Sequence, residues 1–102
     1  MKGFQKKYLR GLAHGLNPVV MVGQKGLTPR VIRSVDEALN THELIKIKFV
    51  DFKEKAHKTT IADRIEAATR SRLVSIIGHT AVFYRPHPDP ENRKIVLPER
   101  HP

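Results

Sequence analysis

Residues 19–39 read VVMVGQKGLTPRVIRSVDEAL, and this stretch decides the expected fold. It opens with four consecutive apolar residues, 19–22, which are typical of a short strand buried on both faces. A Gly-x-x-Gly loop follows at residues 23–26, and Thr28-Pro29 then supplies a favoured N-cap and a favoured first helical residue. Apolar side chains recur at helical spacing from there on, namely Val31, Ile32, Val35, Ala38 and Leu39. The stretch predicts a strand, a loop and an amphipathic helix that ends near residues 40–42.

An amphipathic helix is predicted over residues 4–15, before this stretch. Phe4, Tyr8, Leu9 and Leu12 form its apolar stripe. The remaining surface is occupied by Lys6, Lys7, Arg10 and His14. Gly15 followed by Asn17-Pro18 gives a stop signal. The outer face of this first helix should therefore be basic.

The next segment, residues 44–50, alternates between apolar and basic side chains. Ile45, Ile47 and Phe49 share one face of the expected strand, and Lys46 and Lys48 share the other. One face of this strand should therefore be wet and basic.

Three further elements are expected after this strand. Residues 53–70 carry Ile61, Ile65 and Ala68, with Ala62 beside them, at the period of a helix. Residues 73–77 and 81–84 are rich in strand-forming side chains, and the Gly78-His79-Thr80 turn joins them tightly enough for a hairpin.

The order α-β-α-β-α-β-β predicts a compact α/β sandwich with a mixed sheet, because a helix between two early strands permits parallel pairing. One domain is expected over residues 1–85. Residues 86–102 hold five of the seven prolines and should form a Pro-rich tail, in which residues 94–97 could add a short edge strand.

Charge is the most informative global property of the chain. The 19 Lys and Arg residues against 10 Asp and Glu give a net charge of +9, which is typical of a polyanion binder. No acidic residue precedes Asp36, whereas residues 36–102 hold 12 basic and 10 acidic residues. A solvated face normally interleaves both signs, so the asymmetry favours a binding surface in the first third of the chain.

Several function classes are excluded or disfavoured. The chain has no cysteine, which excludes disulfides, thiolate metal sites and cysteine nucleophiles. No apolar run reaches the ~18 residues of a membrane span, and no signal peptide is evident, so we expect a cytoplasmic protein without a membrane partner. His57, Asp63 and Glu66 lack the spacing of a metal site and should face solvent. No nucleophile-elbow or other catalytic motif appears, so we expect neither a cofactor, a metal nor an enzymatic activity.

The loop is the candidate contact site. Glycine has no Cβ, so Gly23 and Gly26 can bring backbone N–H groups close to phosphate, and the dipole of the following helix adds positive potential. Lys25 within the loop, with Arg30 and Arg33 beyond it, supplies charge at the same place. Two glycines so spaced also occur in ordinary turns, but the surrounding basic residues favour a phosphate-binding function. Leu27 stands where a Walker A loop has its Lys, which disfavours a nucleotide hydrolase.

Three other side chains are candidate contacts for a nucleic acid. His79 in the hairpin turn could touch RNA or stabilise the turn, and the second interpretation is favoured. Phe83 and Tyr84 alternate across the last strand, so at most one could face solvent and stack a base. Both are expected in or near the core.

Four segments appear in an order that closely resembles the CRM domain, named for chloroplast RNA splicing and ribosome maturation. They are GLAH at 11–14, VGQKGLT at 22–28, HELIK at 42–46 and IIGHTAVFYR at 76–85. The resemblance covers nearly all of residues 4–85 and is strongest to the stand-alone bacterial form. One departure is Arg70-Ser71-Arg72, where the family often has a small residue or glycine, which leaves the end of the third helix open.

The resemblance implies a fold similar to the C-terminal domain of translation initiation factor 3, with a KH-like Gly-x-x-Gly loop as the RNA contact. It implies a protein that binds ribosomal RNA of large-subunit precursors during ribosome assembly, and we expect this protein to be a monomer that catalyses no reaction. The implied RNA-binding residues are those of the loop, Gly23, Gln24, Lys25 and Gly26, and the basic residues around it, Lys6, Lys7, Arg10, Arg30 and Arg33. We also expect Thr28, which follows the loop, to belong to the site. Two alternatives stay open: a protein-interaction module whose basic face binds an acidic or ribosomal protein, and an enzyme that uses His57 or His79 as a base.

Overall fold

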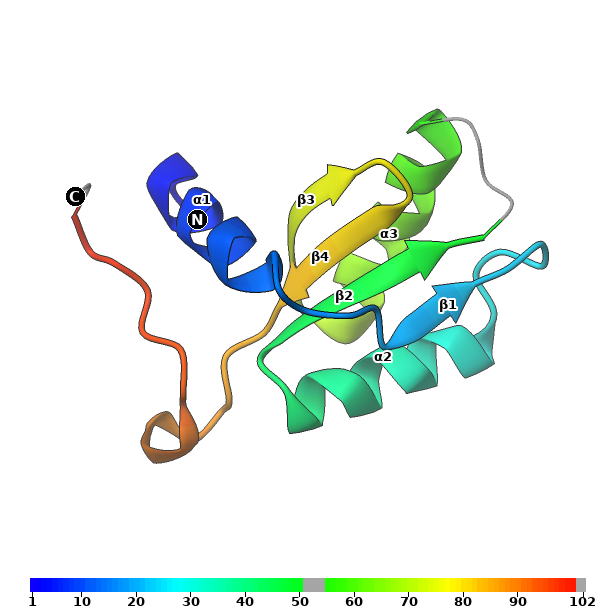
Figure 1. Cartoon of the computed structure of the whole chain (residues 1–102). Coiled ribbons are helices and arrows are strands. Elements are labelled where there is room, and N and C mark those ends of the chain that lie inside the picture. The colour runs from blue at the N-terminus through cyan, green and yellow to red at the C-terminus, as the bar shows by residue number, and fades with distance from the viewer. Residues whose placement is uncertain (51–54, 101–102) are drawn as a thin grey trace.

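The computed structural model describes residues 1–50 and 55–100 and contains, within them, three α-helices and four β-strands in the order α1-β1-α2-β2-α3-β3-β4 (Figure 1). The elements are α1 Gly3–Ala13, β1 Val20–Val22, α2 Pro29–Thr41, β2 Leu44–Phe49, α3 Lys55–Thr69, β3 Arg72–Ile77 and β4 Thr80–Tyr84, followed by a 3-10 turn, η1, at Pro90–Asn92. The predicted order is confirmed. Residues 53–54 of the expected third helix lie outside the described residues.

The four strands form one mixed sheet in the order β1-β2-β4-β3. β1 pairs with β2 in parallel, as expected for two strands joined through α2, and the other two pairings are antiparallel. β3 and β4 form the predicted hairpin. Gly78 in its turn has a φ of +58°, a conformation that glycine adopts without steric cost.

Helices cover both faces of the sheet. α2 and α3 pack on one face, where the core contains Ile45, Ile47, Phe49, Ile65 and Phe83. α1 and the C-terminal tail lie on the opposite face (Figure 1), where a second cluster contains Leu9, Ala13, Leu44, Val82 and Tyr84. The molecule is therefore a sandwich of three layers, α1, sheet and α2–α3.

β1 differs from its prediction. Val20 and Val22 are buried, but Met21 is 54% and Val19 is 52% exposed, so the run is not buried on both faces. β1 is an edge strand, and α1 packs mainly on β2, β3 and β4. The face of β1 on the α1 side is left open to solvent because no helix covers it.

α3 ends one residue earlier than predicted, at Thr69. Arg70 has a φ of +56°, and the Ser71 N–H donates to Glu66 O at 3.2 Å, which is the pattern of a Schellman C-cap. The expected stripe was wrong at Ala68, which is exposed, whereas Ile61, Ala62 and Ile65 are buried.

The predicted solvent-facing role of Glu66 is also corrected. Its side chain is half-buried, and its Oε2 accepts a hydrogen bond of 2.6 Å from the Leu73 N–H at the start of β3. Asp63, in contrast, is exposed as expected.

The tail contains no strand at residues 94–97. The backbone N–H groups of Lys94 and Ile95 donate instead to the Glu43 carboxylate, so they cannot pair with a neighbouring strand. Ile95 and Leu97 pack against the cluster beneath α1, and Gln5 Nε2 donates to Pro98 O at 3.1 Å. The segment after Arg85 therefore lies against the domain. Among the described residues, no helix is long and apolar enough to cross a lipid bilayer.

Candidate nucleic-acid interface

The Gly-x-x-Gly loop is a closed reverse turn. The Gly26 N–H donates to Gly23 O at 2.9 Å, which brings the two glycines together and leaves Gln24 and Lys25 exposed at the tip. Gly26 has a φ of +67°, in the left-handed region that favours glycine. The turn thus presents a lysine at its outermost point, directly after β1.

The turn leads straight into a capped helix. Leu27 packs against the core on the α2 side and anchors the end of the loop. Thr28 Oγ1 accepts a hydrogen bond of 3.2 Å from the Val31 N–H, and Pro29 occupies the first turn of α2, as the sequence predicted. The positive end of the α2 dipole therefore lies next to the turn, and such a helix end favours negative charge.

The two glycines of the turn have different roles. A Cβ built on Gly23 meets no heavy atom within 4 Å, so the fold itself does not need a glycine there. Gly26 is required by its backbone conformation. The missing side chain of Gly23 leaves open space beside the turn, which a ligand can approach.

The other basic residues expected at the site form two groups. Arg30 and Arg33 are exposed on the first turns of α2, close in the chain to the turn. Lys6, Lys7 and Arg10 are exposed on α1, which lies on the opposite face of the sheet from α2 (Figure 1). The sheet separates the two groups, so the predicted residues do not form one compact patch.

Two lysines of β2 lie between these groups and were not assigned to the site from the sequence. Lys46 and Lys48 alternate with the buried Ile45, Ile47 and Phe49, so they point to the α1 side of the sheet. Lys48 is paired with Met21, two residues before Gly23. The alternation in the sequence identified a basic strand face, but only the topology reveals that this face adjoins both α1 and the loop strand.

The hairpin turn is held by backbone and lysine contacts. The Phe49 N–H donates to His79 O at 2.7 Å, and Lys58 Nζ donates to Gly78 O at 2.7 Å. The backbone of His79 therefore fixes the turn, while its imidazole is exposed. Phe83 and Tyr84 are 0% and 4% exposed, which confirms that both belong to the core.

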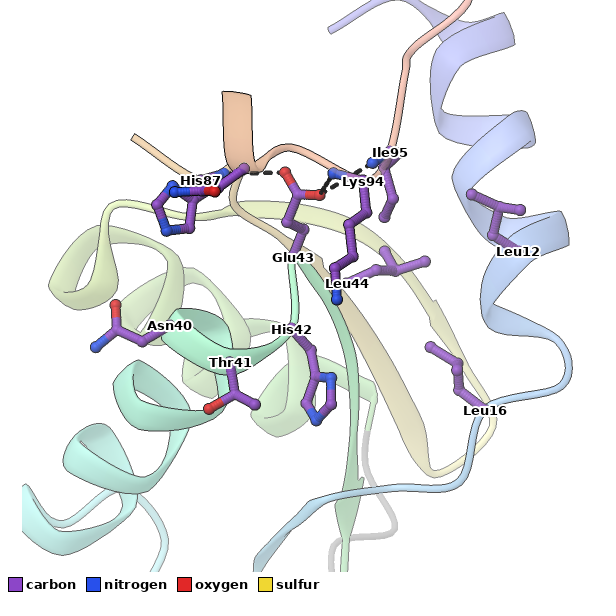
Figure 2. Close-up of a pocket in the computed structure, with 11 residues that line it drawn as sticks. Leu12, Leu16, Asn40, Thr41, His42, Glu43, Leu44, His87, Lys94 and Ile95 are labelled. Atoms are coloured by element: carbon purple, nitrogen blue, oxygen red, sulfur yellow. Dashed lines mark hydrogen bonds between the residues drawn. The ribbon is translucent and has the colours of Figure 1, made fainter. Parts of the chain in front are cut away.

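A cavity of about 320 Å³ lies between the C-terminal end of α1, the α2–β2 connection and the docked tail (Figure 2). Its walls are largely apolar and include Leu12, Leu16, Leu44 and Ile95. Figure 2 shows the carboxylate of Glu43 turned to the backbone of residues 87, 94 and 95. Because both carboxylate oxygens of Glu43 accept these hydrogen bonds, Glu43 is not positioned for acid–base chemistry in the cavity.

No metal-binding cluster of three or more His, Cys, Asp or Glu side chains occurs within residues 1–50 and 55–100. Burial raises the pKa of the Tyr84 phenol, and the nearby negative charge of Glu43 raises it further, against the opposing effect of Arg93. Tyr84 lies in the core beneath α1, so this shift follows from its buried position beside Glu43.

The fold and the turn define a class of protein: a small mixed α/β domain with a basic, glycine-cornered turn at a strand-to-helix junction. The chain belongs to the CRS1 / YhbY (CRM) domain family, whose model matches residues 1–85. The match includes every helix and strand of the sandwich and ends at Arg85, directly after β4.

Relatives of similar length match almost the whole chain. A Haemophilus influenzae protein named RNA-binding protein is 47% identical over 96 residues, which cover 94% of this chain and 93% of the relative. YqeI of Bacillus subtilis, named as a candidate RNA-binding protein, is 38% identical and covers 96% of this chain and 99% of its own length. The solution structure of SAV1595 from Staphylococcus aureus, a hypothetical protein named as a candidate RNA binder, matches with a TM-score of 0.81 at 37% identity, over 96% of this chain and 99% of that one. The match is thus to the stand-alone bacterial form of the domain.

Proposed function

We propose that this chain is a non-catalytic RNA-binding protein that holds phosphate groups with its Gly-x-x-Gly turn and the basic residues around it. The observation that carries the proposal is the position of Lys25, which is exposed at the tip of a closed turn next to the N-terminus of a capped helix. A backbone-lined turn, a helix dipole and a mobile cation converge there, which suits a phosphodiester. Relatives named as RNA-binding proteins support the same function.

Ribosomal RNA of large-subunit precursors is the proposed target. Support comes from the family, whose stand-alone bacterial members the sequence resembles along residues 4–85. Binding through phosphates suits structured RNA, because phosphate contacts depend on backbone shape and carry no sequence information directly. In this role the protein assists ribosome assembly as a monomer and needs no cofactor.

The salt dependence of RNA binding tests the role of the turn. Lys25→Gln should weaken binding to unrelated structured RNAs by similar factors and reduce the slope of log K against log salt by up to about 0.7–0.9, the value for one lost phosphate contact. Arg64→Gln is the matched control, since Arg64 is exposed on α3, outside the proposed site. An unchanged slope for Lys25→Gln would remove Lys25 from the interface.

Crosslinking in growing cells, followed by sequencing of the attached RNA, tests the target. We expect enrichment of large-subunit precursor RNA that is lost in a Gly26→Asp variant, which places a negative charge in the turn. Reads scattered over many RNAs without enrichment would rule out the ribosomal target, and reads unaffected by the substitution would rule out the turn as the contact.

An acidic or ribosomal protein is the second candidate partner. Exposed apolar side chains, Met21 at 54% and Ile77 at 62%, lie in the same row of the sheet as Lys48, and apolar centres with charged surroundings are common in protein interfaces. Nuclease treatment of complexes purified from cells separates the two candidates. Complexes that survive complete RNA digestion would favour the protein partner.

A further inference from the structure

A small pocket of about 130 Å³ opens on the α1 side of the sheet, apart from the Gly-x-x-Gly turn. Arg10 of α1 and His14, the residue that caps its C-terminus, line one wall, and Lys46 of β2, Ser75 of β3 and Thr80 of β4 line the sheet side. Its volume is several times the ~10–15 Å³ that a cavity needs to hold one water molecule. The pocket is large enough for one tetrahedral oxyanion group.

The charges around this pocket are of one sign. The cations Arg10 and Lys46 come from two different elements, α1 and β2, and none of the residues that line the pocket is acidic. The charge of a basic residue near the C-terminus of a helix interacts favourably with the helix dipole. This interaction alone would be enough to explain Arg10. Lys46 belongs to β2, so the dipole of α1 does not account for its presence.

Ser75 adds a polar group that the protein leaves without a partner. Its Oγ is buried and makes no hydrogen bond within the described part of the chain. Most buried polar atoms in folded proteins are hydrogen-bonded, so an exception calls for an explanation. Since Ser75 also lines the pocket, its hydroxyl is a candidate donor to an oxyanion bound there.

A β-bulge directs Ser75 into the pocket. The pairing of β3 with β4 is regular up to Leu73–Phe83 and resumes at Ser75–Val82, so Val74 is the extra residue. Val74 packs in the cluster beneath α1 and Ser75 lines the pocket on that same side, although neighbours in a regular strand would point to opposite faces. Bulges often redirect a side chain next to a functional site.

We propose that this pocket binds a phosphate group, and that in the complex it holds a phosphate of the bound RNA on the α1 side of the sheet. The RNA part of this inference rests on the proposed function, whereas phosphate binding does not. Lys48 connects the two contact points. It pairs with Thr80, which lines the pocket, and with Met21, which precedes the Gly-x-x-Gly turn. The backbone of one RNA segment can therefore run from the pocket along Lys48 to Lys25.

Titration of the full chain with inorganic phosphate, followed by NMR at constant ionic strength with chloride as the balancing anion, tests the pocket without RNA. The amide signals of His14, Lys46 and Ser75 should shift saturably. Lys46→Gln and Ser75→Ala should abolish or strongly weaken this response, and Arg64→Gln should leave it unchanged. Ser75→Ala removes only an unpartnered hydroxyl, so the fold should survive. Shifts that do not saturate, or that all variants lose equally, would overturn the inference.

RNA binding by the same variants separates the pocket from the proposed function. When it is combined with Lys25→Gln, Lys46→Gln should lower the slope of log K against log salt by up to about a further 0.7–0.9, because each substitution removes a different phosphate contact. If wild-type protein binds RNA and Lys46→Gln and Ser75→Ala leave affinity and slope unchanged, the RNA part of the inference is wrong and the proposed function stands. If wild-type protein binds phosphate in the pocket but no RNA, the proposed function fails while the phosphate site remains.

Discussion

The Glu43 carboxylate accepts a hydrogen bond of 2.6 Å from the backbone N–H of Lys94, 51 residues further along the chain. It also accepts from the backbone of His87 at 2.9 Å and of Ile95 at 3.0 Å. One side chain before β2 thus binds three points of the tail. Burial alone would raise the pKa of Glu43, but the bonds from His87, Lys94 and Ile95 and the charge of Arg93 outweigh it and hold the pKa below 4.5.

The docking of the tail should therefore depend on pH. A carboxyl group with a lowered pKa in the folded state stabilises that state fully above its unfolded value, 4.5, and the contribution is lost as the pH falls through the folded pKa. Amide hydrogen exchange at Lys94 and Ile95 should be slow near neutral pH and lose its protection in this acidic range. Glu43→Gln should lose protection at all pH values, whereas Glu99→Gln, at an exposed position of the tail, should behave as wild type. Equal protection in Glu43→Gln would show that apolar packing alone holds the tail.

Arg70→Gly should stabilise the protein. Arg70 has a φ of +56° at the end of α3, which costs a residue with a Cβ roughly 1–2 kcal/mol and costs glycine little. After the greater flexibility of glycine in the unfolded chain is subtracted, we expect a gain of about 0.5–1 kcal/mol in the free energy of unfolding. Urea denaturation measures it. Arg70→Ala keeps the Cβ and should bring no gain, so equal stabilisation by both variants would assign the effect to the lost charge.

Local patterns were sufficient to predict the order of elements and the start of α2. Thr28-Pro29 acts through its immediate neighbours, and its cap forms as expected. The Gly78 turn likewise has a local signal, a glycine with a φ of +58° between two strand-forming runs, although contacts from Phe49 and Lys58 also hold it. The residue type at position 70 does not mark the helix end. α3 ends just before this position, and the residue there has the left-handed conformation expected of a glycine, although it is an arginine.

Features that depend on distant parts of the chain could not be predicted in the same way. Whether Met21 is buried is decided by where α1 packs, and α1 packs mainly on other strands. A lone glutamate such as Glu43 carries no local sign that it will bind the tail. Lys46 and Arg10 are far apart in the sequence and meet only because β2 and α1 share a face. The hydrophobic pattern defines the faces, but the topology determines which faces combine into a site.

Arg85→Lys should destabilise the protein although it preserves the charge. The Arg85 guanidinium donates to Asp36 Oδ1 at 2.7 Å, Thr69 O at 2.7 Å and Asn40 Oδ1 at 2.8 Å, and thereby joins the end of β4 to α2 and α3. A lysine ammonium cannot reproduce this planar set of donors, and we expect a loss of about 1–3 kcal/mol.

Asp36→Asn provides the matched comparison for Arg85→Lys. The Asp36 side chain is 50% exposed, so its ion pair should contribute less than about 1 kcal/mol, and the backbone acceptors of Arg85 remain. Thermal or urea denaturation of both variants compares them directly. If Asp36→Asn were the more damaging change, the ion pair and not the helix-end carbonyls would be the main partner of Arg85.

Alanine at the two loop glycines should separate stability from RNA binding. Gly26→Ala forces a Cβ into the left-handed region at φ +67°, so it should lower the free energy of unfolding by roughly 1–2 kcal/mol. Gly23→Ala meets open space, with no heavy atom within 4 Å of the added carbon, and should leave stability almost unchanged.

Gly23→Ala should lower RNA affinity even though it leaves stability almost unchanged. In Gly23→Ala the new methyl group occupies the space through which a phosphate approaches the turn, so we expect affinity to fall about tenfold, equivalent to about 1.4 kcal/mol. Denaturation and RNA titration of the same preparation measure both properties, and Arg64→Ala controls for a general surface effect. A Gly23→Ala protein that is stable and binds RNA as tightly as wild type would mean that phosphate does not approach the turn at Gly23, and would leave Lys25 to act at longer range.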